Sequence, residues 1–267
     1  MNNNELKTYL DSLVEQYNHS DFIAKDPISI PHQFTKLQDI EITGFWTAIL
    51  SWGLRKTIIN KANLLFNDLM EGSPYDFIMN HHPSDLKRVL NFKHSTFNAT
   101  DTLYFIEFFK DYYSKHKSLE DAFTEGMKAS DKNMLNGLIY FHNKFFALED
   151  APQRTRKHVS TPARKSACKR INMFLRWMVR NDNKGVDFGL WKNISPNKLL
   201  IPLDVHVERT SIKLGLIKEQ NNKLEETIEL TNALKTFDPA DPVKYDFALF
   251  GIGVMPEGLG IRDKKML

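Results

Sequence analysis

The chain has 267 residues, of which 42% are apolar and 26% are charged, a composition typical of a globular protein with a large core. Its one cysteine, Cys168, excludes a disulfide framework, a cysteine-rich zinc site and a four-cysteine iron–sulfur cluster. No run of 18 apolar residues is present, and the first residues lack the features of a signal peptide. We therefore expect no membrane association and a cytoplasmic location.

Helical periodicity predominates along the chain, and glycine and proline are sparse, with 12 and 11 residues. Strict apolar–polar alternation is hard to find, so the sequence predicts an all-α fold. In chain order, we expect helices over 5–17, 39–52, 57–70, a segment after Ser73-Pro74, 101–113, 118–129, 136–148, 164–180, a segment after Asp204, 224–236 and 242–253.

The helix expected over 164–180 has the clearest amphipathic pattern. Apolar residues recur at helical spacing, namely Ile171, Phe174, Leu175, Met178 and Val179. Lys169, Arg176 and Arg180 lie within roughly 40° of one another on the opposite face at 100° per residue. The pattern predicts a core stripe on one side of the helix and a basic face on the other.

Positive charge is concentrated around this helix. Residues 151–181 contain nine Lys or Arg and no Asp or Glu, whereas the remainder holds 27 basic and 33 acidic residues. Such an asymmetry favours a polyanionic partner, most commonly nucleic acid, although a solvated basic face is the simpler interpretation.

A carboxylate follows the apolar run 199–203. Asp204 immediately precedes a periodic helical segment, which is the usual place of an N-cap residue. On this evidence alone, a purely structural role for Asp204 is sufficient.

Three segments resemble the helix-hairpin-helix DNA glycosylase superfamily, which includes endonuclease III and the 8-oxoguanine DNA glycosylases. They are 45–52, 168–176 and 203–209, in the order found in that superfamily. By this resemblance Lys169 matches the catalytic lysine and Asp204 the catalytic aspartate. The chain also resembles an uncharacterised bacterial family of unassigned function.

The resemblance implies a two-lobed helical fold, with one lobe from 38–180, including the hairpin-like Lys-bearing helix, and a second from 1–37 and 181–267. It implies a glycosylase and abasic-site lyase in which the Lys169 amine attacks the sugar and Asp204 stabilises the positive charge. The expected partner is duplex DNA with a damaged base, possibly an oxidised purine, or an abasic site. We expect no cofactor, no metal and no obligate protein partner.

Several other side chains are candidates for contacting DNA. Trp52 is either a wedge that stacks on bases or a core residue, and His206 either orients a phosphate or packs. The candidate nucleic-acid-binding residues are Arg164, Lys165, Arg170, Arg176, Arg180, His206 and Trp52.

The sequence departs from the superfamily in several ways, including a longer spacing between Lys169 and Asp204 than in endonuclease III and the lack of iron–sulfur cysteines. The hairpin segment 161–166 has no glycine, although close approach of backbone amides to a phosphate normally requires one. The usual glutamine after 51–52 is replaced by Gly53 or Leu54. These departures leave open a non-catalytic DNA- or RNA-binding helical protein on the same scaffold, or an enzyme with a different activity.

Overall fold

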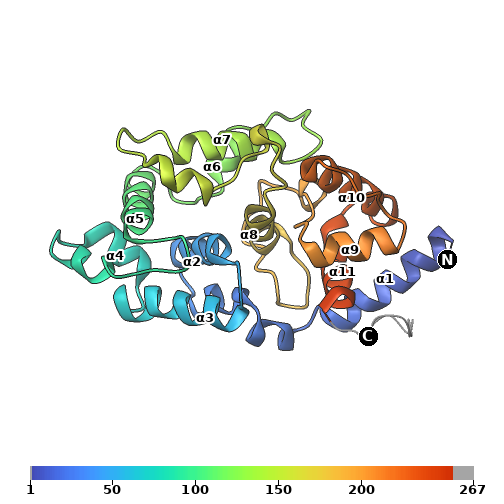
Figure 1. The fold of residues 1–267 in the computed structure, drawn as a ribbon, viewed down its shortest axis with the longest axis horizontal. Coiled ribbons are helices and arrows are strands. Elements are labelled where there is room, and N and C mark those ends of the chain that lie inside the picture. The colour runs from blue at the N-terminus through green and yellow to red at the C-terminus, as the bar shows by residue number, and fades with distance from the viewer. Residues whose placement is uncertain (1, 255–267) are drawn as a thin grey trace.

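The computed structural model describes residues 2–254, and within that range the chain is built from helices without a β-strand (Figure 1). The all-α prediction is therefore confirmed. The α-helices are α1 (Asn3–Tyr17), α2 (Leu37–Leu50), α3 (Arg55–Asn63), α4 (Pro74–Asn80), α5 (Ala99–Tyr113), α6 (Asp121–Thr124), α7 (Leu135–Phe145), α8 (Lys169–Val179), α9 (Val205–Lys213), α10 (Lys223–Phe237) and α11 (Tyr245–Val254). No helix in this range is both long and apolar enough to cross a membrane.

Two predicted helices are shorter than their patterns suggest. The segment 118–129 contains only α6, because α7 packs directly on the following turn, where a Cβ at Gly126 would lie 2.0 Å from Cβ of Tyr140. The helix expected over 164–180 begins only at Lys169. Its N-cap, Cys168, has a left-handed conformation with φ of 48°, which a continuous right-handed helix cannot contain.

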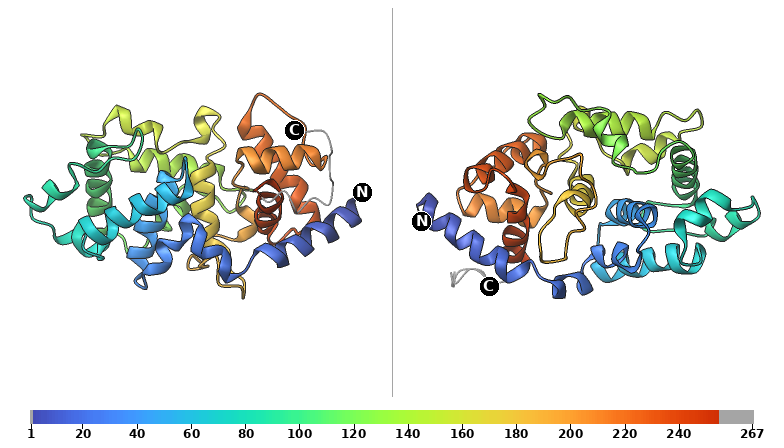
Figure 2. Two further views of the ribbon diagram at one scale, coloured as in Figure 1. Left: turned by 60° about the horizontal axis from the view of Figure 1, so that its bottom comes forward. Right: turned by 180° about the vertical axis from the view of Figure 1, so that it is seen from behind.

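Helix α8 lies at the centre of the molecule (Figures 1 and 2). Helix α2 packs against α8 on one side, and α9, α11 and α1 form a separate group in which α11 contacts both α1 and α9. The amino-terminal helix thus lies with the carboxy-terminal helices. The division into lobes at 37/38 and 180/181 stays a prediction.

The chain that leaves α8 folds back onto it. The Phe188 amide donates to the Trp177 carbonyl at 2.7 Å, and the Trp191 amide donates to the Met178 carbonyl at 2.9 Å. Segment 186–191 therefore covers the carboxy-terminal end of α8. It includes Asp187, which pairs with Arg176 and Arg180 on the face of α8 that the sequence predicts to be basic.

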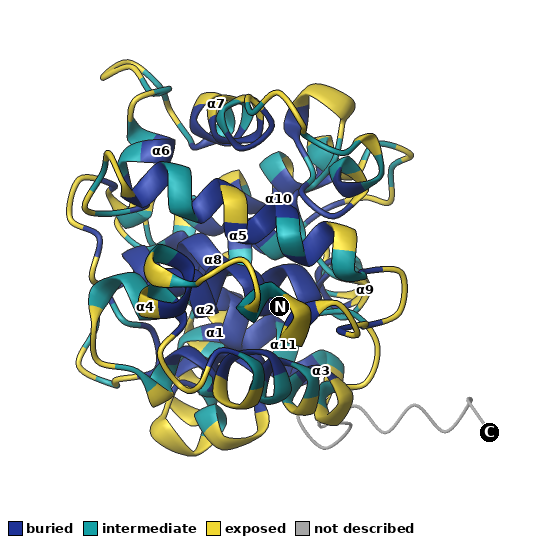
Figure 3. Cartoon of the chain, turned by 90° about the vertical axis from the view of Figure 1, so that its left-hand side faces the viewer, coloured by how far each residue is buried: buried dark blue, intermediate teal, exposed yellow. Residues whose placement is uncertain are grey.

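Aromatic packing fixes α2 against α8, and both helices are largely buried (Figure 3). The Phe45 ring of α2 lies with its centre 5.3–6.0 Å from five other phenyl rings, those of Phe105, Phe109, Phe141, Phe145 and Phe174. A Cβ at Gly44 would lie 3.3 Å from the Phe174 ring, so glycine permits the close approach of the two helices.

A buried carboxylate links α2 to its surroundings. Glu41 has no exposed surface, and its oxygens accept hydrogen bonds from Tyr113 Oη, Ser118 Oγ, the Leu119 amide and Trp191 Nε1. Burial raises the pKa of Glu41, and these four donors oppose that rise by stabilising the charged form. The network ties α5 and segment 186–191 to the helix that leads into Ser51 and Trp52.

Candidate active site

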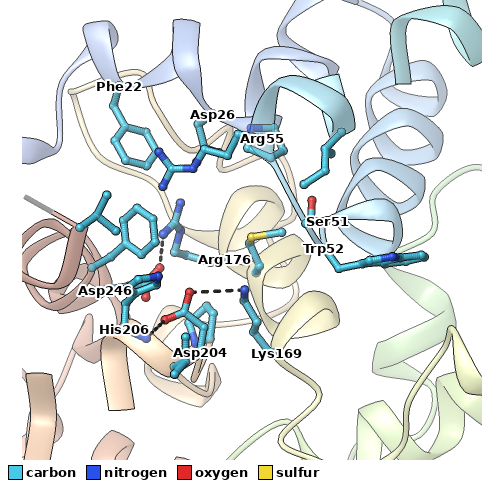
Figure 4. A pocket seen from close by; sticks show the side chains of 18 residues that line it. Phe22, Asp26, Ser51, Trp52, Arg55, Lys169, Arg176, Asp204, His206 and Asp246 are labelled. Carbon is cyan, nitrogen blue, oxygen red and sulfur yellow. Dashed lines mark hydrogen bonds and ion pairs between the residues drawn. The ribbon is translucent and has the colours of Figure 1, made fainter. Parts of the chain in front are cut away.

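The main cavity has a volume of about 630 Å³ and opens beside the amino-terminal ends of α8 and α9 (Figure 4). It is lined by residues from α3, α8, α9 and α11 and from three segments outside the α-helices, 22–27, 51–53 and 202–204. One face of α8 supplies Lys169, Met173 and Arg176, at positions i, i+4 and i+7. Segments far apart in the sequence therefore meet around one opening.

Lys169 and Asp204 meet in this cavity. Lys169 Nζ lies 3.4 Å from Asp204 Oδ2, and the two side chains are 36% and 12% exposed. Each residue stands at the start of a helix: Lys169 is the first residue of α8, and Asp204 precedes α9. The structure thus brings together the two residues to which the resemblance assigns catalytic roles.

Asp204 is also the N-cap of α9. Its Oδ1 accepts hydrogen bonds from the amides of His206 and Val207, both at 2.9 Å, while Oδ2 faces Lys169. One oxygen therefore satisfies the helix terminus and orients the carboxylate, and the other is directed at the amine. The structural and chemical roles use different atoms of the same side chain.

Arg176 and Arg180 require a correction to the sequence analysis. Both are on the predicted face of α8, but they are buried and paired with carboxylates instead of being exposed to DNA. Arg176 Nη1 donates to Asp246, and Arg176 Nε donates to Asp187 at 3.2 Å. Arg180 pairs with Asp182, Asp187 and Asp241 at 2.7–3.0 Å.

The pKa shifts in this cluster follow from burial and pairing. Burial lowers the pKa of Arg180, but its carboxylate partners more than offset this, so the pKa lies above its ordinary value. Burial raises the pKa of Asp246 to about 6, although Arg176 favours the charged form. These arginines are the countercharges of an interior ion-pair cluster, and Arg176 also lines the cavity.

Trp52 and Arg170 pack against each other. The Arg170 guanidinium lies 4.9 Å from the centre of the Trp52 ring, and Arg170 Nη1 also donates to the Ile49 carbonyl. The Trp52 ring stacks on His158 with centres 5.6 Å apart and contacts His94, and it points away from Lys169 and Asp204 in Figure 4. The DNA contacts of Trp52 and Arg170 remain a prediction, and both side chains already have packing partners within the protein.

The other candidate residues lie around the site rather than in its centre. Arg164 and Lys165 are exposed on the turn before α8, where Lys165 has a left-handed φ of 58°, and neither lines the cavity. His206 lines the cavity, but its Nδ1 lies 3.2 Å from the Gly253 carbonyl and its ring packs on Phe250. This position suits the packing role of His206.

Several cavity residues were missed by the sequence analysis. Asp26 is buried in the cavity wall, where its Oδ1 accepts from the Ile28 amide at 3.1 Å and burial raises its pKa. Arg55 lies with its guanidinium 4.7 Å from the centre of the Phe250 ring. Among the missed residues, Met173 could have been predicted from the sequence, because it follows Lys169 by four positions on the same helix. Asp26 and Arg55 reach the cavity through packing between segments that are far apart in the sequence.

No group of three or more His, Cys, Asp or Glu residues in the described part of the chain is arranged to hold a metal ion. The polar groups that line the cavity include the Lys169 amine, the carboxylates of Asp26, Asp204 and Asp246, the guanidinium groups of Arg55 and Arg176, the His206 imidazole and the Ser51 hydroxyl.

A family model with the description "Protein of unknown function (DUF2400)" matches residues 26–255. Because the match covers most of the chain, the chain belongs to that family. No curated protein and no solved structure matches it. The matched range contains Asp26, Lys169, Asp204 and Asp246, and every residue that lines the cavity except Phe22 lies within it.

Proposed function

We propose that the protein is a DNA glycosylase with abasic-site lyase activity, on a helix-hairpin-helix-like scaffold, in which Lys169 is the nucleophile and Asp204 the stabilising carboxylate. The observation that carries this proposal is the 3.4 Å approach of Lys169 Nζ to Asp204 Oδ2 in a cavity of about 630 Å³. Such a volume is in the range of small-ligand pockets and suits one extruded nucleoside.

The chemistry assigns a separate step to each group. The uncharged Lys169 amine attacks C1′ of the sugar, the C1′–N bond breaks, and the base leaves with the bonding electron pair and takes up the proton that the amine nitrogen loses. Asp204 stabilises the positive charge that develops on the sugar. Opening of the sugar ring then gives a C1′=N imine, from which loss of a C2′ proton expels the 3′-phosphate. No oxidant or reductant is needed.

The imine gives a direct test. Borohydride adds hydride to C1′ and converts the imine to a stable amine, so we expect wild-type protein to become covalently linked to abasic-site DNA. Lys169→Gln removes the nucleophile and should abolish this adduct while binding persists. Lys213→Gln removes an exposed lysine of α9 and should leave the adduct yield unchanged. Denaturing electrophoresis of protein with labelled DNA measures the adduct.

The outcomes separate the proposal from its alternatives. DNA binding by wild-type protein without any adduct would favour the non-catalytic binding protein, for which the glycine-free turn 161–166 is the supporting feature. An adduct that survives Lys169→Gln would assign the nucleophile to another residue.

A second prediction concerns phosphate contacts. Arg164 and Lys165 are exposed beside the start of α8, so replacing both with alanine should weaken binding to all duplex sequences. Because each neutralised phosphate contributes about 0.9 to the log–log salt slope, the slope should become shallower by about one to two. Fluorescence anisotropy at several salt concentrations measures this slope. The control replaces the exposed Lys213 and Lys218 with alanine, and an equal effect of both double variants would place the contacts elsewhere.

A further inference from the structure

Lys169 stands at the start of a helix that has no side-chain cap. The N-cap residue, Cys168, has a left-handed φ of 48°, and its side chain makes no capping hydrogen bond. The hydrogen bonds nearest to this end are local: the Cys168 amide donates to Ser166 Oγ at 3.1 Å, and Asn172 Nδ2 donates to the Ala167 carbonyl at 2.9 Å. Because helix ends open more easily than helix centres, the position of the Lys169 amine depends on what ties this end to other elements.

Arg170 connects this end of α8 to α2. Its Nη1 donates to the carbonyl of Ile49, which lies in the last turn of α2, where carbonyls have no partner within the helix. The Arg170 guanidinium also lies 4.9 Å from the centre of the Trp52 ring. Successive residues of a helix point about 100° apart, so Arg170 reaches α2 while Lys169, the residue before it, lines the cavity.

The ring on which Arg170 packs is itself held in place. The Trp52 ring stacks on His158 at an interplanar angle of 12°, and His158 Nε2 lies 3.3 Å from Oδ2 of Asp101, whose carboxylate has no exposed surface. Oδ1 of Asp101 accepts a hydrogen bond from Thr155 Oγ1 at 2.7 Å. Arg170 therefore packs on a side chain that is fixed by α5 and by the segment before α8.

Charge pairing does not explain an arginine at this position. Among the described residues, no carboxylate forms an ion pair with Arg170, in contrast to Arg176 and Arg180 of the same helix. Burial lowers the pKa of Arg170 to about 10, so its surroundings disfavour the cation. What arginine alone provides here is a flat group that donates to a carbonyl and packs on an indole ring at the same time.

We infer that Arg170 is a positioning residue, which holds the first turn of α8 against α2 so that Lys169 Nζ stays directed at the reacting carbon; this inference rests on the proposed function. The backbone of this turn determines where the Lys169 amine can reach, and in the structure the amine lies 3.4 Å from Asp204. A displacement of about 1 Å at a reacting group can cost about 100-fold in rate. Arg170 therefore acts on the chemical step and not on the affinity for DNA.

The inference predicts a loss of rate without a loss of binding. Arg170→Met keeps most of the volume but loses the hydrogen bond to Ile49, so it should slow borohydride trapping at saturating protein by about tenfold to 100-fold. The Kd for a duplex with a tetrahydrofuran abasic analogue, which cannot form an imine, should stay at the wild-type value. Arg170→Lys keeps a donor but not the flat group, so its trapping rate should lie between those of Arg170→Met and wild type. The control is Arg88→Met, which removes an arginine that pairs with Glu71 and does not line the cavity.

Hydrogen exchange tests the anchor without the chemical step. The Asn172 amide donates to the Cys168 carbonyl at 2.9 Å and forms the first backbone hydrogen bond of α8. In Arg170→Met this amide should exchange about tenfold faster or more, because a hydrogen bond from a charged group no longer holds this end of the helix. The Arg180 amide, at the other end of α8, should exchange at the wild-type rate. Amide-resolved exchange followed by NMR measures both.

The two measurements distinguish failure of the inference from failure of the proposed function. Wild-type trapping and exchange rates in Arg170→Met overturn the inference and leave the glycosylase proposal intact. Weaker binding with a salt slope that is shallower by about one would show that Arg170 contacts a phosphate, which also overturns the inference.

The remaining outcomes involve the wild-type protein and the folding of the variant. Faster exchange of the Asn172 amide in Arg170→Met, with no adduct from wild-type protein, overturns the lyase activity and supports the anchor. If wild-type protein forms no adduct and exchange of this amide does not depend on Arg170, both proposals are wrong. If Arg170→Met does not fold, Arg170→Lys takes its place, and wild-type trapping and exchange rates in Arg170→Lys overturn the inference.

Discussion

Replacing Asp204 with asparagine should slow base excision by about two to three orders of magnitude, the range found when one charge-stabilising group is removed from an active site. Asparagine keeps the oxygen that caps α9, where Asp204 Oδ1 accepts from the His206 and Val207 amides. It removes the negative charge that Oδ2 directs toward Lys169 and the cavity. The free energy of unfolding should therefore be nearly unchanged. Single-turnover excision from damaged duplex DNA and urea denaturation measure the two effects.

The two roles of Asp204 can be separated with matched variants. Asp204→Ala removes both the charge and the cap, so it should lose activity and also about 1 kcal/mol of stability. Asn222 caps α10 through the amides of Leu224 and Glu225, and it does not line the cavity. Asn222→Ala should therefore cost similar stability without slowing excision. If Asp204→Asn excises bases at the wild-type rate, Asp204 is a cap and nothing more.

Much of the helical fold is predictable because each helix has a local apolar pattern. Helices α1, α2, α5, α7 and α10 begin and end within a few residues of the predicted ranges. The beginning of α8 was not predictable in this way, since the left-handed conformation of Cys168 has no glycine or proline to mark it. The predicted helix over 118–129 is longer than α6, because the end of α6 depends on contact with α7.

The candidate site is predictable only in part. The resemblance pairs Lys169 with Asp204 across 35 positions of sequence, and the structure places their charged atoms 3.4 Å apart. The sequence does not predict that the basic face of α8 is buried. A helical wheel gives the direction in which a side chain points, but it does not show which other parts of the chain pack against that side chain. Segment 186–191 and α11 supply carboxylates to that face, and neither position could be inferred from local pattern.

Arg180→Met should cost about 3–5 kcal/mol of unfolding free energy, because removing one partner of a buried ion pair leaves the others uncompensated. Methionine preserves most of the volume of the side chain, so the loss reports mainly on charge and hydrogen bonds. Arg180 is 2% exposed and contacts Asp182, Asp187 and Asp241. Urea denaturation measures the loss, and Arg209→Met on the exposed surface of α9 is the control.

The stability deficit of Arg180→Met should also depend on pH. Burial raises the pKa of Asp241, and the charge of Arg180 opposes that rise. Without the guanidinium the pKa of Asp241 rises further, so the folded variant binds a proton more readily than the unfolded chain. Stability then increases relative to wild type as the pH falls. The prediction is contradicted if Arg180→Met loses less than about 1 kcal/mol of unfolding free energy, or if this loss increases as the pH falls. Either result would show that the charge of Arg180 does not stabilise the surrounding carboxylates.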